Sequence, residues 1–164
     1  MNKKELNRLA KIELEHIQIE LKHKRGSHIR HFIDQDFCFK YGYVTKNWNP
    51  RWEDLVRKGA VSEKALNSKN RKEIVKEHLV PLKYIKQVLL ALPDKKISSL
   101  SLLEKELKKI VKFGTIHKSE NKKLNKMGLR SKMPEEYFNR KHELHNDLYA
   151  RYKIAEIKFV EVSF

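Results

Sequence analysis

The spacing of the apolar residues is the feature that most constrains the fold of this chain. Apolar side chains recur every three or four residues over 3–24, 82–92 and 100–109, which predicts amphipathic helices there. Residues 110–117 and 154–162 instead have the composition of strands. We therefore expect an α+β fold that is helix-rich and contains a small β element.

The length of the chain, 164 residues, fits one domain of ordinary size, and 40% apolar content is enough to build a core. We expect a single domain over residues 1–164, in which an amphipathic N-terminal helix (1–26) accompanies a basic α+β body (60–164). The helix would pack on the body or serve in dimerisation, which leaves a homodimer open. Within the body we expect Ser119 to cap a helix that ends near Lys126, and a further helix over 138–152.

Several classes of protein are disfavoured by what the chain lacks. A single cysteine, Cys38, excludes an internal disulfide and a zinc site of several thiolates. The N-terminus leads into a charged helix, and no stretch approaches the ~20 apolar residues of a membrane span. No glycine-rich phosphate loop or nucleophile elbow is present, so nucleotide hydrolysis has no support. We expect a cytoplasmic protein without a membrane partner.

The charge balance points to a partner. The chain has 37 Lys and Arg against 21 Asp and Glu, a formal net charge of +16, with an isoelectric point near 9.8. Such an excess repels itself in the compact state, and it usually persists because a polyanion neutralises it. Nucleic acid is the expected partner, DNA rather than RNA, and an acidic protein partner is the alternative.

The positive charge is concentrated between residues 105 and 132, where ten basic residues face only Glu106 and Glu120. Lysine and arginine side chains neutralise the phosphates of nucleic acids without distinguishing base sequence. Tyrosine and tryptophan also occur in a basic neighbourhood, where they either stack on unpaired bases or pack in the core: Tyr41, Tyr43, Trp48 and Trp52. Among the basic residues of this part of the chain, we expect eight to bind phosphates: Lys109, Lys112, Lys118, Lys122, Lys123, Lys126, Arg130 and Lys132.

A short run in the middle of the chain carries the chemistry that we consider most specific. Residues 77–82 read Glu-His-Leu-Val-Pro-Leu, and the strand-like segment 110–117 leads into a helix that begins Ser-Glu-Asn at 119–121. Over residues 74–126 this arrangement resembles the HNH, or ββα-metal, nucleases, which have an acid–His–apolar–apolar–Pro start and a later helix that bears an asparagine.

The resemblance implies a metal-dependent endonuclease of a defence, restriction or mobile-element system. It implies catalytic roles for His78, Glu77 and Asn121. His78 would act as the base that takes a proton from water, and a histidine near its ordinary pKa of ~6.5 can do so at physiological pH. Glu77 and Asn121 would hold one divalent metal, Mg²⁺ or Mn²⁺.

Other interpretations remain open. Arg140 followed by His145 resembles the Arg-x4-His signature of HEPN ribonucleases, which cleave RNA without a metal. The chain could also be a non-catalytic DNA- or RNA-binding protein, in which Glu77 and His78 form only a structural turn. An inhibitor that docks an acidic partner is the third alternative.

Overall fold

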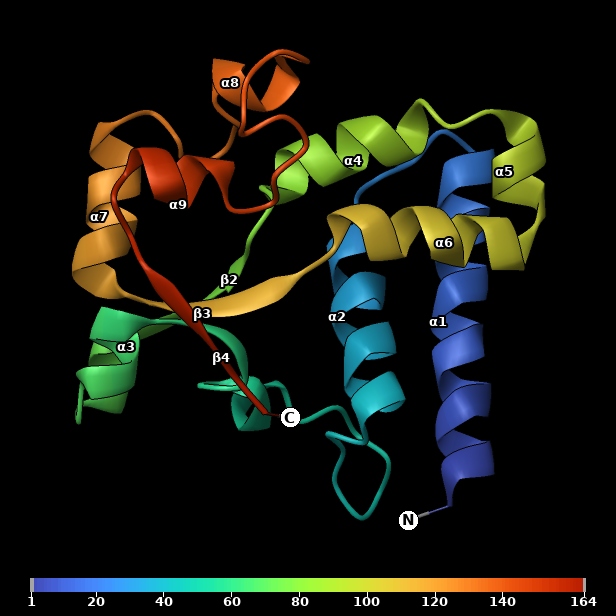
Figure 1. The fold of residues 1–164 in the computed structure, drawn as a ribbon. Helices are drawn as coiled ribbons and strands as arrows, with labels where there is room; N and C mark the ends of the chain where they lie inside the picture. Colours follow the sequence, from blue (N-terminus) through green and yellow to red (C-terminus); the bar gives the residue numbers. More distant parts are fainter. Residues whose placement is uncertain (1, 164) are drawn as a thin grey trace. The chain divides into compact units, whose positions relative to one another are not determined.

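A computed structural model describes residues 2–163 of the protein (Figure 1). Its elements confirm an α+β fold that is rich in helix and contains a small sheet. The longer helices are α1 (Lys3–Lys22), α2 (Ile29–Tyr41), α4 (Leu82–Leu90), α6 (Leu100–Ile110) and α7 (Lys118–Lys126). The shorter ones are η1 (Trp52–Leu55), α3 (Glu63–Asn67), η2 (Arg71–Glu73), α5 (Asp94–Ser98), α8 (Glu135–Phe138) and α9 (Ala150–Ile154). The strands are β1 (Gly59–Ser62), β2 (Ile74–His78), β3 (Phe113–His117) and β4 (Phe159–Val162).

The chain forms two compact units, and the boundaries between them fall within or beside helices. Unit 1 contains the residues up to Leu55 together with Lys86–Lys109, and unit 2 contains Val56–Ile85 together with the residues from Ile110 onward. The expected organisation as one domain remains a prediction.

Unit 1 is helical, and the predicted amphipathic N-terminal helix is its longest element. Helix α1 is capped by Asn2, whose side chain accepts from the backbone N–H of Lys4, and the helix buries one face against α2. Ala10 of α1 packs with Phe39 of α2 and with Val44 in the following loop. The apolar spacing of residues 3–24 therefore serves to cover the aromatic-rich helix that follows.

Unit 2 is built on a four-stranded sheet with the strand order β2-β3-β1-β4. Strand β3 is parallel to β1 and antiparallel to β2, whereas β4 is antiparallel to β1. In the β2–β3 pair, His78 lies opposite Phe113 and Ile74 lies opposite His117. Helix α7 follows β3 without a loop, so it begins at the end of the sheet where β2 starts.

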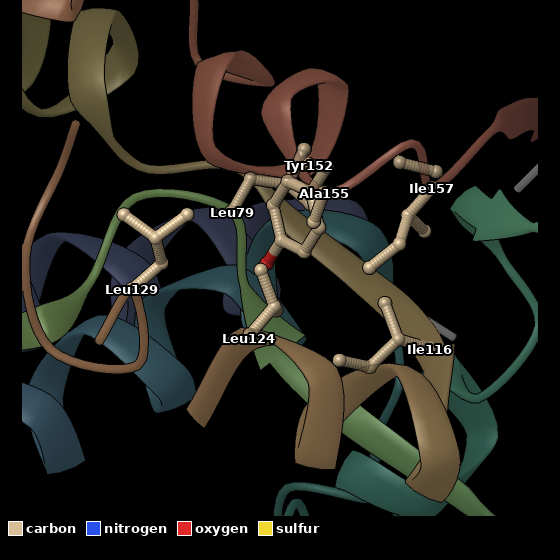
Figure 2. Packing of buried hydrophobic residues seen from close by; sticks show 8 residues of the cluster. Leu79, Ile116, Leu124, Leu129, Tyr152, Ala155 and Ile157 are labelled. Carbon is tan, nitrogen blue, oxygen red and sulfur yellow. The ribbon is translucent and has the colours of Figure 1, made fainter. Parts of the chain in front are cut away.

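Both faces of this sheet are covered, which explains why every residue of β1 is buried. On one face, Ala60 belongs to a cluster with Leu79, Leu124 of α7 and Tyr152 of α9. Figure 2 shows how the side chains of Leu79, Leu124 and Tyr152 meet between the sheet and the two helices. On the other face, the neighbouring β1 residue Val61 packs with the Ala65 side chain of α3. Alternation along a strand sends successive side chains to opposite faces.

Some predicted elements differ from the structure. The predicted helix over 138–152 is wrong, because only α8 and α9 are helical at its two ends and turns occupy the middle. Asparagine and aspartate side chains cause this, since Asn139 Oδ1 accepts from the Lys141 N–H and Asp147 Oδ1 accepts from the Tyr149 N–H. Asn146 is left-handed, with φ of 56°. The predicted strands 110–117 and 154–162 are shortened to β3 and β4. Helices α6 and α9 take only the first residue of each, and the second strand is delayed further by a turn in which Glu156 has φ of 54°.

The helices described in residues 2–163 include none with both the length and the apolar character that a bilayer crossing requires.

Gly114 in β3 provides a test of the packing inside the sheet. A Cβ at this position would lie 2.8 Å from Leu79 Cδ2 and 2.9 Å from the backbone oxygen of Ala60, closer than real Cβ atoms approach. We expect Gly114→Ala to lower the free energy of unfolding by about 1–3 kcal/mol through overpacking, as measured by urea denaturation. Gly26→Ala is the control, because its Cβ would meet the flexible end of Lys86 instead. Equal destabilisation by the two variants would contradict this account.

Candidate functional site

The side chain of Arg151 is completely buried and joins three segments of unit 2. Its Nε donates to the backbone oxygen of Leu79 at 2.9 Å, and its Nη2 donates to the backbone oxygen of His78 at 2.6 Å. Nη2 also donates to the hydroxyl of Tyr152 at 2.6 Å. Burial raises the pKa of Tyr152 well above its ordinary value, so this hydroxyl stays neutral and accepts the bond.

The same guanidinium reaches the loop after α7. Its Nη1 donates to the backbone oxygens of Leu129 at 3.0 Å and Arg130 at 3.2 Å. Its Nη2 forms an ion pair with Glu77 Oε1 at 3.2 Å. A buried guanidinium is tolerated only when its charge is paired and its N–H groups have acceptors. Arg151 therefore fixes the end of β2, the start of α9 and the loop after α7 relative to one another.

Glu77, a predicted catalytic residue and metal ligand, forms an ion pair with the buried Arg151. Its side chain is 19% exposed, and the oxygen that pairs with Arg151 also accepts from the backbone N–H of His78 at 3.2 Å. The carboxylate thus compensates the charge of the buried guanidinium. A structural role for Glu77 is built into the fold.

His78, the predicted base, lies at the end of β2 beside Glu77, as the sequence motif requires. It is 7% exposed, and its ring lies 4.7 Å from the ring of Phe113, centroid to centroid. Leu79 continues the pairing with the chain before β3, since its N–H donates to the backbone oxygen of Lys112 at 2.8 Å. His78 is therefore held in a fixed position with little of its surface accessible.

Asn121, the third predicted catalytic residue, is not brought to Glu77 and His78. It lies in the first turn of α7, which begins beside the Ile74 end of β2, whereas His78 ends that strand. Four residues of strand separate the two ends by about 14 Å. Within residues 2–163, no three or more His, Cys, Asp or Glu side chains form a group suited to a metal ion.

The start of α7 is capped differently from our expectation. His117, and not Ser119, is the N-cap: its Nδ1 accepts from the Ser119 N–H at 3.1 Å. Glu120 completes a capping box by accepting from the His117 N–H at 2.8 Å, and its Oε2 also accepts from the Ser62 hydroxyl at 2.5 Å. His117 occupies the N-cap position because its Nδ1 accepts from the backbone N–H of the residue two positions later.

His117 also makes a contact outside the helix. Its Nε2 lies 3.3 Å from Glu73 Oε2, and this hydrogen bond holds the pKa of the Glu73 carboxyl below its usual range. Since Nδ1 accepts from a backbone N–H, Nε2 carries the proton and donates it to Glu73. The start of α7 is thus tied to β1 through Glu120 and to the segment before β2 through Glu73.

The predicted phosphate-binding residues fall into two groups. Three are paired with carboxylates: Lys109 with Glu106 at 2.8 Å, Lys112 with Glu161 at 2.7 Å, and Lys123 with Glu156 at 3.3 Å. Lys109 belongs to unit 1, and the other two belong to unit 2. The second group is exposed and forms no ion pair with any residue described in 2–163: Lys118, Lys122, Lys126, Arg130 and Lys132.

Lys118, Lys122 and Lys126 share one side of α7, and we call them the α7 lysine stripe. A spacing of four residues places side chains on the same helix face, with a rise of about 6 Å between successive members. The opposite side of the helix buries Leu124 in the core of unit 2. The helix therefore has an apolar face that anchors it and a cationic face that is exposed.

Arg151 is the residue of this region that the sequence did not reveal. It is one of 37 basic residues, and the backbone oxygens that accept from its side chain belong to segments more than twenty residues away in the chain. No local pattern distinguishes an arginine of this kind from an exposed one.

Comparisons of the chain with protein-family models, with curated proteins and with solved structures gave no significant match.

Removal of the Arg151 guanidinium should be the most costly single change at this site. We expect Arg151→Met to lower the free energy of unfolding by about 3–5 kcal/mol, because Glu77 and four backbone oxygens lose their donor while the cavity remains buried. Urea denaturation followed by circular dichroism measures this. Arg130→Met is the control, since the side chain of Arg130 is exposed and only its backbone oxygen is used. A loss below about 0.5 kcal/mol in Arg151→Met would contradict the role assigned to it.

Proposed function

We propose that this protein binds nucleic acid through its phosphate groups, at the exposed face of α7. The α7 lysine stripe is the observation that carries this proposal. Its three lysine side chains are exposed on one side of a helix whose other side is buried. Lys118 also interacts electrostatically with Glu73 and helps to lower the pKa of that carboxyl. Cations held in a row on an exposed helix face are suited to successive phosphates of one strand.

The surroundings of the stripe support the same proposal. Unit 2 contains 20 of the basic residues and 10 of the acidic ones, so its net charge is +10. Arg130 and Lys132 extend the exposed cations beyond the end of α7, and Arg151 fixes the backbone that carries Arg130. Phosphate contacts position a protein on nucleic acid but do not read sequence. We expect DNA to be preferred over RNA and the protein to act in the cytoplasm, with dimerisation open.

Charge removal from the stripe tests the proposal. We expect Lys118→Gln, Lys122→Gln and Lys126→Gln together to weaken binding to duplex DNA, and to reduce the slope of log K against log salt by about 2.7. Fluorescence anisotropy with a labelled duplex at several salt concentrations measures both quantities. The physical reason is that three phosphates would no longer release their counterions.

The matched control removes the same charge elsewhere. Lys3→Gln, Lys4→Gln and Lys11→Gln lie on exposed positions of α1 in unit 1. We expect this triple variant to retain most of the affinity and nearly the full salt slope. If the two triple variants lost the same amount of affinity, binding would depend on the net charge of the protein and not on the position of the stripe. Failure of the unaltered protein to bind DNA or RNA would overturn the proposal and favour the acidic protein partner.

A second candidate function is metal-dependent cleavage of the bound nucleic acid. The order of the elements favours it, because β2 and β3 are antiparallel and α7 follows directly, with Glu77 and His78 at the end of β2. A strand–strand–helix order is what the HNH resemblance implies. In this proposal His78 takes a proton from water, the water oxygen bonds to phosphorus, and the bond from phosphorus to the leaving oxygen breaks.

The metal ligands of that scheme are only partly supported. The cofactor would be Mg²⁺ or Mn²⁺, but Glu77 and Asn121 are not brought together, and Glu77 already pairs with Arg151. Of the two residues, Glu77 is the one that lies beside His78. A divalent ion in this proposal therefore needs a second ligand from outside the predicted pair.

Cleavage assays decide between the two functions. If the second proposal is correct, His78→Asn should lower the rate of cleavage at least about 100-fold while leaving affinity nearly unchanged. Labelled duplex DNA, single-stranded DNA and structured RNA are each incubated with Mg²⁺, Mn²⁺ or EDTA and analysed on gels. His23→Asn, at an exposed position of unit 1, is the control. Metal-independent cleavage, or none, would leave the protein as a binder in which Glu77 and His78 are structural.

A further inference from the structure

The segment that follows α7 alternates between buried anchors and exposed functional groups. Leu129, Met133 and Tyr137 are at most 6% exposed, and they fix the segment at intervals of four residues. Between and after them, Arg130, Lys132, Phe138, Arg140 and Lys141 are exposed. A surface segment that is anchored in this way presents its exposed side chains at defined positions.

Phe138 is a large apolar side chain that the fold leaves about half exposed. Its exposed fraction is 52%, although it lies beside two other aromatic rings. The ring of Tyr84 is 5.5 Å away and that of Tyr137 is 5.1 Å away, centroid to centroid, both nearly perpendicular to it. Edge-to-face contacts of this kind are favourable and limit the movement of the ring.

The two tyrosines that support Phe138 are themselves fixed. The rings of Tyr84 and Tyr137 meet edge to face at 5.6 Å, and burial raises the pKa of Tyr137 to about 12, so its hydroxyl is neutral at physiological pH. The backbone oxygen of Tyr137 accepts from the Asn146 N–H at 3.0 Å. Phe138 is therefore presented as a half-exposed ring on a rigid support, and little entropy would be lost when a flat partner stacks on it.

The charges near this ring indicate what kind of partner it suits. Exposed basic residues accompany the three aromatic residues along the chain and outnumber the acidic ones: Lys83, Arg130, Lys132, Arg140 and Lys141 against Glu135, Glu136 and Glu143. A protein partner that covered Phe138 with an apolar surface would also desolvate these cations. A nucleotide brings a flat ring together with the phosphate that neutralises them.

We propose that Phe138 stacks on an unpaired base of a single-stranded nucleic acid, whose backbone the neighbouring Arg130, Lys132, Arg140 and Lys141 contact. This inference rests on the proposed function and adds to it a substrate class, since in a duplex the faces of internal bases are already stacked. Stacking does not depend on base identity, because every base has a π-face. The aromatic residues considered from the sequence, such as Tyr41 and Trp52, belong to unit 1, whereas Phe138 belongs to unit 2.

The experiment compares a labelled single-stranded oligonucleotide with the same sequence as a blunt duplex, by anisotropy at constant salt. We expect Phe138→Ala to weaken binding to the single strand by about tenfold and to change binding to the duplex less than twofold. Phe138→Trp should restore binding, and its fluorescence should be quenched when the single strand is added. Met127→Ala is the control, because Met127 is also an exposed apolar side chain, 41% exposed, and lies outside the aromatic group.

The possible outcomes separate this inference from the proposed function. Unchanged single-strand affinity in Phe138→Ala, or an equal loss for single strand and duplex in a variant with an unchanged melting temperature, would overturn the stacking role alone. A dimer that dissociates in Phe138→Ala while oligonucleotide affinity is retained would also overturn it. Duplex binding that depends on the α7 lysine stripe would still support the proposed function in those cases. Absence of any nucleic-acid binding would overturn both.

Discussion

The buried guanidinium of Arg151 is the interaction on which the structure of unit 2 depends. It takes acceptors from the end of β2, from the loop after α7 and from its neighbour Tyr152, and Glu77 balances its charge. Apolar packing alone could not fix these irregular segments, because their carbonyl groups need donors inside the protein. The exposed residues that follow α7 are positioned by the same contacts, so the stability of the core and the shape of the basic surface are not independent.

Much of the fold was predictable from local pattern. The helical spacing of 3–24, 82–92 and 100–109 corresponds to α1, α4 and α6, and the predicted strand composition of 110–117 contains β3. Strand β1 was not predicted, because its four residues carry no alternation of polar and apolar side chains. Both of its faces are buried, one by α3, which follows directly, and the other by α7 and α9 from distant parts of the chain.

The site was predictable in part. Glu77 and His78 do end a strand, and the exposed cations of α7 lie where charge imbalance indicated. The sequence could not show that Glu77 pairs with Arg151, that Lys112 and Lys123 pair with carboxylates, or that Asn121 lies at the far end of β2. Each of these depends on contacts between residues far apart in sequence. A count of the charges along the chain does not show which of them form ion pairs with one another.

The sheet order also has a consequence for how unit 2 forms. Strand β1 ends at Ser62, yet its two neighbours, β3 and β4, begin at Phe113 and Phe159. During synthesis the central strand therefore waits for about fifty residues to gain its first partner and for nearly one hundred to gain its second. Pairings of such long sequence separation fold slowly and leave apolar strand edges open meanwhile. The emerging chain is therefore most exposed to aggregation at this stage.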